Sequence, residues 1–505
     1  MSKIGNIESN SKIRNYALGI LVVVYTFNFI DRQILSILLE SIKADLGLTD
    51  TELGLLSGLA FALFYATLGI PIAKYADKGN RRNIIAVSIG IWSFMTALSG
   101  LAQNFYHLLI ARIGVGVGEA GCSPPAHSMI ADYFPENKRS TALGIYSLGI
   151  PFGIMFGLFA GGWINEIFGW RLAFFVVGLP GLILAIIFRL TVREPVRGEA
   201  EGKIASDNQP EIFETILYLI KKKTFKHLVL GASLAAFVGY GAITWLPSFF
   251  QRSYGMQTGD VGLYLGLILG IPGGIGIFFG GYLSDYLGSK DTRWSLWIIG
   301  IAMALSAPLY ILVYLSPSAN SSFLWLIIPV ALGNFYQAAT FSKTQGLVDL
   351  RMRSVAAAIL LFVINIIGLG AGPSSVGYVS EILKTDYGYI KDSLRYSLLI
   401  FASLKVWCGF HYFMAGKYLK KDLENSTEYT RPLRYKAIHF RKELITIIFF
   451  ALLAILNIKL IGPIGLIISI TFAMYFFFKD DAFKNFIEKI LILFIMIKKR
   501  WDLTR

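Results

Sequence analysis

The sequence is poor in charged residues and in cysteine for a chain of its length. Asp, Glu, Lys and Arg make up 16% of its 505 residues, whereas 55% are hydrophobic. A soluble chain of this size needs charged surfaces around several domains, so the composition argues against a soluble multidomain protein. The two cysteines, Cys122 and Cys408, both lie in apolar segments and offer no disulfide framework.

Sequence motifs of enzymes are also missing. The chain has no phosphate-binding glycine loop, no metal-ligand helix motif and no nucleophile elbow followed by acid and base partners. We therefore predict that the protein is not an enzyme and needs no metal or cofactor. Its net charge of +15 does not imply nucleic acid, because its Lys and Arg residues collect in loops, where they set membrane orientation.

Apolar runs of roughly 20 residues recur along most of the chain, and each is long enough to cross a bilayer as a helix. They predict an all-α polytopic membrane protein with twelve core segments. The segments run over residues Tyr16–Leu38, Leu53–Ala73, Ile84–Leu101, Phe105–Ala131, Ala142–Ile164, Leu172–Leu190, Phe225–Phe250, Val261–Leu283, Ser295–Leu315, Phe323–Leu347, Val355–Ile382 and Ser397–Tyr418.

A polar stretch divides these segments into two sets of six. We predict an N-terminal six-helix bundle over residues 1–191, an inter-half linker over 192–224 and a second bundle over 225–420. Residues 421–505 form a hydrophobic extension with a basic beginning. Within it, Leu444–Leu456 and Ile461–Phe478 suit a short membrane hairpin, and Phe483–Arg500 suits a helix on an anionic membrane surface.

The loops between the segments indicate how the protein is oriented in the membrane, and two of them share a sequence pattern. Clusters of Lys and Arg follow the even-numbered segments, which predicts that both termini of the core face the cytoplasm. The loop AKYADKGNRR (Ala73–Arg82) and the loop GYLSDYLGSKDTR (Gly281–Arg293) share a small residue, an Asp four positions later, a Gly and then basic residues. The two loops occupy the same place in each half, as expected for parallel halves of a transporter.

The fourth segment carries charge where a membrane helix normally has none. Arg112 and Glu119 are seven residues apart, so they lie on one helix face, about 10 Å apart along the axis. Charge at membrane depth is costly and usually marks a pathway or a buried pair. A buried ion pair that only locks two helices together remains the alternative. Gly114, Gly116 and Gly118 let a neighbour approach the backbone, and Pro124–Pro125 are expected to break the helix.

These residues resemble a known family. The loop Ala73–Arg82 is similar to the signature loop of the major facilitator superfamily, with Ala73 where that signature usually has Gly, and GIYSLGIPFG (Gly144–Gly153) resembles its Gly/Pro-rich motif. NFIDRQ (Asn28–Gln33), Arg112–Pro135 and WRLAFFVVGLPG (Trp170–Gly181) are similar to the Spinster-like subfamily of lysophospholipid and sphingosine-1-phosphate transporters and their bacterial relatives. The resemblance is strong in the first half, general in the second and absent after about residue 420. It implies two parallel six-helix bundles around a central cavity.

The resemblance places segments one and four at that cavity. Asp31 and Arg112 each lie about 10 Å below the outer end of their segment, at matching depth for a pair. We predict that Asp31 and Glu119 carry protons, because the proton affinity of a desolvated carboxylate depends on nearby Arg. Arg32 and Arg112 would tune them or hold an anionic head group. A fixed salt-bridge network is the alternative.

Other positions complete the expected site. Candidates for the second wall of the cavity are polar or aromatic, although such residues often only bond adjacent helices: Tyr240, Trp245, Asn334, Tyr336, Gln337 and Asn365. His127 is either titratable or a packed, neutral histidine near Pro124 and Pro125. A cytoplasmic gate that closes the outward-open state is expected from Asp77, Arg81, Arg82, Arg139, Asp285, Arg351 and Arg353, with simple enforcement of topology as the alternative.

The sequence therefore predicts a secondary active transporter that is coupled to protons. It would act as a monomer in a bacterial cytoplasmic membrane, among membrane lipids, on an amphiphilic, lysophospholipid- or sphingolipid-like anion. A small organic anion or a drug-type export substrate remains open. A channel or a lipid scramblase is the alternative from another class, but neither requires proton-coupling carboxylates.

Overall fold

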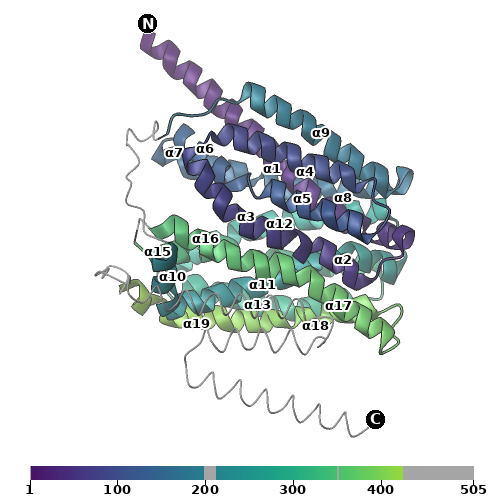
Figure 1. Cartoon of the computed structure of the whole chain (residues 1–505). Coiled ribbons are helices and arrows are strands. Elements are labelled where there is room, and N and C mark those ends of the chain that lie inside the picture. The colour runs from purple at the N-terminus through teal and green to yellow at the C-terminus, as the bar shows by residue number, and fades with distance from the viewer. Residues whose placement is uncertain (1, 198–211, 350–351, 425–505) are drawn as a thin grey trace. The chain divides into compact units, whose positions relative to one another are not determined.

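A computed structural model describes residues 2–197, 212–349 and 352–424, which all belong to one compact unit, Met1–Tyr429. The second unit, Thr430–Arg505, lies outside the described residues, and so do the expected hairpin and the surface helix. All regular secondary structure in the described part is helical (Figure 1).

The helices of the first half follow the predicted segments, and several segments are divided in two. They are α1 (Ser2–Leu46), α2 (Asp50–Ser57), α3 (Leu59–Lys78), α4 (Arg81–Ser99), α5 (Phe105–Glu119), α6 (Ser123–Tyr133), α7 (Glu136–Ser147), α8 (Gly149–Phe168) and α9 (Trp170–Thr191).

The second half repeats this pattern after a short helix in the linker. Its helices are α10 (Ile212–Lys221), α11 (Lys223–Tyr254), α12 (Thr258–Gly288), α13 (Trp294–Tyr314), α14 (Ala319–Gly333), α15 (Tyr336–Gly346), α16 (Arg353–Ile364), the π-helix η2 (Asn365–Ala371), α17 (Gly372–Thr385), α18 (Ser393–Ala402) and α19 (Leu404–Glu424).

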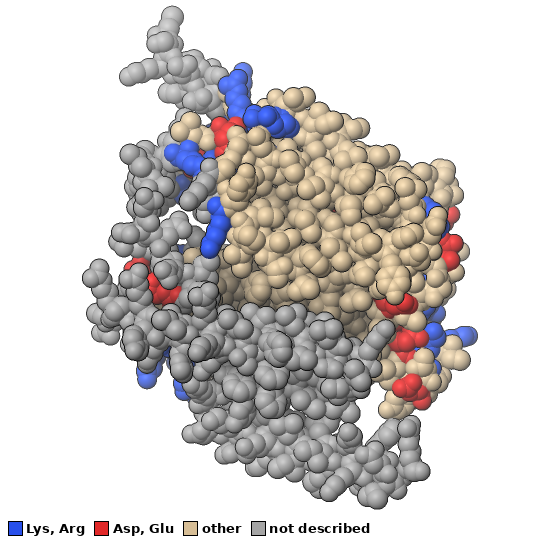
Figure 2. Space-filling view, viewed as in Figure 1, with Lys and Arg blue, Asp and Glu red and all other residues tan. Residues whose placement is uncertain are grey.

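Eleven helical stretches of the described chain are long and apolar enough to cross a membrane. The remaining predicted segment, Phe105–Ala131, is divided between α5 and α6. Figure 2 shows Lys, Arg, Asp and Glu at two opposite ends of the visible face, with a band free of charge between them. This distribution is the one that a bilayer requires of a spanning protein.

The structure corrects three local predictions. The first helix begins well before Tyr16 and continues to Leu46. The linker contains the helix α10, in which Leu217 and Leu219 are buried. The fourth segment breaks at residues 120–122 rather than at its prolines, which instead occupy the first turn of α6. Proline is tolerated there because the first N–H groups of a helix have no helical partner.

The two halves pack tightly at the end that carries the α1–α2 and α11–α12 loops. The two largest contact surfaces between them are those of α8 with α12 and of α2 with α17. Glycines make both approaches possible: a Cβ atom at Gly262 would lie 2.3 Å from the Leu158 carbonyl oxygen, and one at Gly54 would lie 2.8 Å from that of Pro373. Small residues let membrane helices approach this closely.

Enlarging Gly262 is therefore expected to weaken this contact. We expect Gly262→Ala to lower the free energy of unfolding by about 1–3 kcal/mol, since backbone would have to move. The measurement is thermal unfolding of the purified protein. Gly274→Ala on the same helix is the control, because no atom outside its own helix lies within 4 Å of the position of its Cβ. Equal unfolding temperatures for the two variants would contradict the packing argument.

Toward the opposite end the halves diverge. Helix α3 packs on η2, but α3 and α16 do not form a packed pair among the described helices. Figure 1 shows α3 rising away from α16 toward α6 and α7. The halves are thus closed at one end and separated at the other.

Candidate functional site

The glycines of α5 place its charged residues inside the first half. A Cβ atom at Gly116 would lie 2.6 Å from the Phe61 carbonyl oxygen, and one at Gly118 would lie 2.6 Å from the Trp92 nitrogen. Helix α5 therefore packs directly against the backbones of α3 and α4. This close packing buries Glu119 completely, at the last residue of α5.

Glu119 forms a buried ion pair with Arg32 of α1. The Nε atom of Arg32 donates a hydrogen bond of 2.6 Å to Oε2 of Glu119. The other carboxylate oxygen, Oε1, is buried and makes no hydrogen bond of ordinary geometry, although the Asn28 side chain lies near the carboxylate. An unpaired carboxylate oxygen away from water is costly, so this atom is a natural position for a proton.

Asp31 and Arg112 complete the cluster, but they do not pair as the matching depth suggested. Both are buried, and among the described residues no ion pair joins them. Arg112 and Glu119 nevertheless act electrostatically on Asp31, and one oxygen of Asp31 is also buried without a partner. Arg32 is the residue that contacts Glu119 directly. Adjacent side chains of α1 point about 100° apart around the helix axis, so Asp31 and Arg32 face different neighbours.

Aromatic rings surround the Arg32 guanidinium. Its carbon Cζ lies 4.9 Å from the Phe29 ring centre, 5.1 Å from that of Phe61 and 4.6 Å from that of Tyr65. Tyr240 of the second half also acts electrostatically on Arg32. The predicted cavity residue Tyr240 therefore meets the charged cluster where the two halves come together.

The other predicted residues of the second half have different surroundings. Trp245 is fully buried and donates a hydrogen bond of 2.9 Å to the Pro373 carbonyl, so it is a core residue rather than part of a cavity wall. Gln337 donates to the Asn334 side chain at 3.0 Å. Asn365 begins η2, and π-helical turns are frequent at functional sites.

His127 and Tyr336 differ in their exposure to solvent. His127 is exposed, and the edge of its ring meets the Tyr146 ring, with centroids 5.4 Å apart. Tyr336 is buried and lies near Tyr240 and Cys408.

The predicted gate residues of the first half contact that half and the beginning of the linker. Arg81 is buried, forms ion pairs with Asp132 and with Glu194 and donates 2.8 Å to Ser128. The Arg82 amide donates to Glu194, and Arg139 donates to the Ala131 carbonyl. The side chain of Asp77 lies outside the described residues. The hydrogen bonds of Arg81 and Arg82 go to the first half and to residues 192–195 at the beginning of the linker.

The second-half gate residues are likewise not assembled. Asp285 and Arg353 are exposed, and neither forms an ion pair with any residue that the structure describes; Arg351 is outside the described residues. In this loop Arg293 pairs with Asp291 instead, at 2.8 Å, and its guanidinium lowers the pKa of Asp291. A gate at this end stays a prediction for a conformation in which the halves meet there.

An ion-pair network that the sequence analysis missed joins the halves at the closed end. Arg252 of α11 donates to Glu40 of α1 at 2.7 and 2.9 Å and to Asp50 of α2 at 2.7 and 2.8 Å. Asp50 also pairs with Lys43 and accepts from Ser380 of α17 at 2.7 Å. We call Arg252, Glu40, Asp50 and Lys43 the outer latch. Its charged residues can be recognised in the sequence at the ends of the apolar segments. The sequence does not show that they pair with one another across the two halves.

A helical membrane protein with two packed halves and a buried charged cluster inside one of them has the organisation of a transporter, and comparisons with known proteins agree. The family model described as Major Facilitator Superfamily matches residues 21–375. A crystal structure titled as a bacterial homolog to the human lysosomal transporter Spinster, in an inward-facing and occupied conformation, is 32% identical over 81% of this chain and 98% of that one, with a TM-score of 0.72.

Three curated relatives show how widely the similarity extends. An MFS-type efflux pump of Mycolicibacterium smegmatis is 32% identical over 81% of this chain and 94% of its own. Protein spinster homolog 1 of Xenopus tropicalis is 26% identical over 82% of each chain. The hexuronate transporter of Bacillus subtilis is 26% identical over 81% of this chain and 97% of its own. The chain belongs to the major facilitator superfamily of transporters and, within it, to the Spinster-like group.

Proposed function

We propose that this transporter couples the movement of an amphiphilic organic anion to protons through Asp31 and Glu119. The observation that carries the proposal is the buried Arg32–Glu119 pair, in which Oε1 of Glu119 makes no hydrogen bond of ordinary geometry. Protonating Glu119 would remove its buried negative charge and weaken its hold on Arg32. The released guanidinium could then bind an anionic substrate, so that proton and substrate binding are linked.

The separation of the halves supports an alternating-access cycle. With the predicted orientation, the outer latch closes the extracellular side, and the end where α3 leaves α16 faces the cytoplasm. The described conformation is then inward-facing. Opening to the outside requires the latch to break, and the predicted gate around Asp77, Arg81 and Asp285 would close the other end. We place the protein in a bacterial cytoplasmic membrane, as a monomer with both core termini in the cytoplasm.

The surroundings of Arg32 favour an amphiphilic substrate. Two guanidiniums, of Arg32 and Arg112, supply positive charge for a head group, and the rings of Phe29, Phe61 and Tyr65 offer apolar surface beside it. Tyr240 extends the aromatic surface to the second half. A head group and a hydrocarbon chain would thus find separate surroundings. The Spinster-like relatives support this choice of lipid-like anion.

A small organic anion is the second candidate. A bidentate carboxylate is a good ligand for Arg32 or Arg112, and one relative is named a hexuronate transporter. The efflux pump among the relatives keeps an export substrate open as well. A channel or scramblase is disfavoured, because neither needs carboxylates buried among arginines.

Ligand-induced stabilisation distinguishes these substrates. The purified protein would be heated with a lysophospholipid, with sphingosine phosphate and with glucuronate, at acidic and at neutral pH. A ligand present at 100 times its dissociation constant stabilises the folded state by about 2.7 kcal/mol. We expect stabilisation by the amphiphiles that Arg112→Ala abolishes. Stabilisation by glucuronate alone would favour the second candidate, and ion conduction by charge-neutral variants would favour a channel.

A further inference from the structure

A cavity with two basic residues lies at one end of the second half. Its volume is about 400 Å³, and it is formed by the end of α15, the start of α16 and the end of α19. The residues that line it are Ser342, Lys343, Gln345, Gly346, Arg353 and Leu423. Four of the six have polar side chains, two of these are cations, and none of the six is an acid. The cavity is therefore positively charged.

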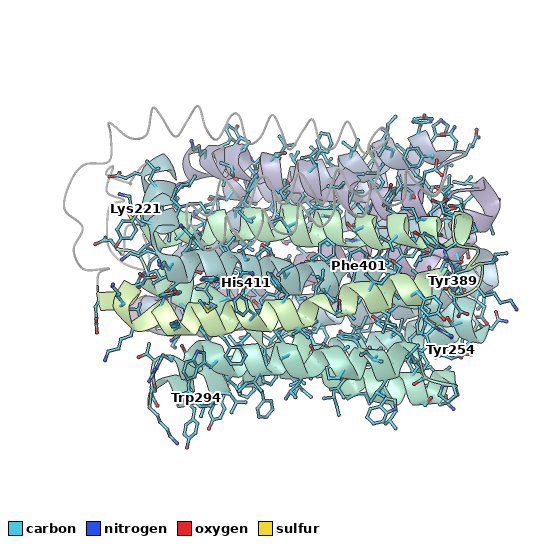
Figure 3. The ribbon with its side chains drawn as sticks, turned by 90° about the horizontal axis from the view of Figure 1, so that it is seen from below. Lys221, Tyr254, Trp294, Tyr389, Phe401 and His411 are labelled. Carbon is cyan, nitrogen blue, oxygen red and sulfur yellow. The ribbon has the colours of Figure 1, made fainter. Side chains whose placement is uncertain are left out.

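The cavity lies at the end of the second half that the loop charges assign to the cytoplasm. Lys222, between α10 and α11, donates a hydrogen bond of 3.0 Å to the carbonyl of Asp422, so the end of α19 lies beside the end of α10. Figure 3 shows Lys221 and Trp294 at this end of the second half and Tyr254 at the opposite end. With the predicted orientation, the cavity opens near the cytoplasmic leaflet, whose surface potential is negative because of its anionic lipids.

Neither cation of the cavity has a carboxylate to neutralise it. Lys343 is half-buried in the last turn of α15, and Arg353 is exposed as the first residue of α16. Neither forms an ion pair with a residue that the structure describes. The Asp422 carboxylate, next to Leu423 in the chain, accepts a hydrogen bond of 2.8 Å from the Thr224 amide instead. Two cations on one cavity repel each other, so an anion bound in it is stabilised by both.

The hydrogen-bond donors of the cavity suit a phosphate group. The planar guanidinium of Arg353 can donate to two phosphate oxygens, and the Lys343 ammonium adds a point charge. The Ser342 hydroxyl and the Gln345 amide can donate further hydrogen bonds. A volume of about 400 Å³ falls in the range of small-molecule sites, so it leaves room for the organic group that carries the phosphate. Leu423 offers apolar surface to that group.

We propose that this cavity binds the phosphate group of an anionic membrane lipid such as phosphatidylglycerol. Basic pockets between membrane helices on the cytoplasmic side bind lipid head groups of this kind. Lys343 and Arg353 hold the phosphate, and Gly346 leaves space for it. In the described chain, the atom outside α15 that would lie within 4 Å of a Cβ at Gly346 is Cδ2 of Leu423, at 3.6 Å. The site is separate from the charged cluster around Arg32, which belongs to the first half.

A gate residue without its partner is the competing explanation. Arg353 is also predicted to meet the first half when the cytoplasmic end closes, and that role alone would leave it unpaired in the described conformation. In that case, lipids would stabilise the protein independently of Lys343 and of the space beside Gly346. Two variants therefore separate the explanations. The double variant Lys343→Gln, Arg353→Gln removes the charge, and Gly346→Leu fills the space while it keeps the charge.

The test measures the unfolding temperature of the full chain in an uncharged detergent with added phosphatidylglycerol, phosphatidylcholine or glycerol 3-phosphate. We expect phosphatidylglycerol to raise the unfolding temperature of wild type by about 3 °C more than phosphatidylcholine does. This difference should fall below about 1 °C in Lys343→Gln, Arg353→Gln and in Gly346→Leu. The matched control is Lys290→Gln, Lys420→Gln, which removes two exposed charges at the same end that do not line the cavity. It should keep the full difference.

Glycerol 3-phosphate identifies the source of the phosphate. Stabilisation by phosphatidylglycerol alone supports a lipid head group. Stabilisation by glycerol 3-phosphate as well, lost in the same variants, supports a site that also accepts free phosphate esters. Stabilisation by glycerol 3-phosphate alone would overturn the lipid as the ligand.

Two results would overturn the site itself. One is a wild-type difference in Lys343→Gln, Arg353→Gln, and the other is an equal loss in Lys290→Gln, Lys420→Gln. The cavity variants change the site in different ways, so if one does not fold the other still provides the test. Arg112→Ala, which alters the charged cluster of the first half, should keep the difference. The lipid site can therefore fail independently of the function proposed above.

Discussion

We expect Glu119→Gln to abolish proton-driven transport while substrate exchange persists. Gln is similar in shape and keeps a hydrogen-bond acceptor for Arg32, but it cannot bind and release a proton. One proton moving per substrate down a gradient of one pH unit supplies about 1.4 kcal/mol, which corresponds to a tenfold concentration ratio. In proteoliposomes with such a gradient, wild type should approach about tenfold accumulation or depletion, and the variant should reach none.

Two further variants are compared in the same assay. Asp260→Asn removes an exposed carboxylate from the first turn of α12 and should leave gradient-driven transport unchanged. Asp31→Asn should resemble Glu119→Gln, because its carboxylate also has a buried oxygen without a partner. Gradient-driven transport by Glu119→Gln at the wild-type level would mean that the Arg32–Glu119 pair is only a structural contact.

The second large effect is expected at the outer latch. Arg252→Ala removes four hydrogen bonds from one guanidinium to Glu40 and Asp50, which belong to the opposite half. Losing them should cost the closed state about 2–3 kcal/mol, since Glu40 loses its charged partner and Asp50 keeps only Lys43 and Ser380. This corresponds to a shift of roughly 30- to 150-fold in favour of the state that is open at this end.

Electron spin resonance can measure this shift directly. Spin labels on Gln103→Cys and Lys391→Cys report on exposed positions of the first and second half at the latch end. The population with a long distance between the labels should increase in Arg252→Ala. Arg395→Ala is the matched control, because Arg395 pairs with Asp392 within one half. An unchanged distance distribution in Arg252→Ala would show that glycine-mediated packing alone closes this end.

Part of the site could be predicted from the sequence, because charged residues are rare in membrane-spanning segments. Arg112 and Glu119 interrupt an apolar segment, and Asp31 and Arg32 interrupt another, so all four stand out without any structure.

For aromatic and amide side chains, residue type did not predict whether the side chain lines the cavity. Trp245 was expected at the cavity, but its indole N–H bonds to Pro373 within the core. Asn334 and Gln337 bond to one another. An aromatic or amide side chain can be satisfied by a nearby helix just as well as by a ligand, so its type alone does not tell which way it points.

The sequence by itself determined the class of protein, the helical segments, the division into halves and the buried charges. These features follow from local hydropathy and from the high cost of charge in a membrane, which act on each segment separately. Only the tertiary structure decided that Arg32 rather than Arg112 contacts Glu119, that Arg252 joins the halves and that the opposite end is open. Pairings of this kind depend on how helices rotate and pack against one another, and residues far apart in the chain carry no local signal of which partner they meet.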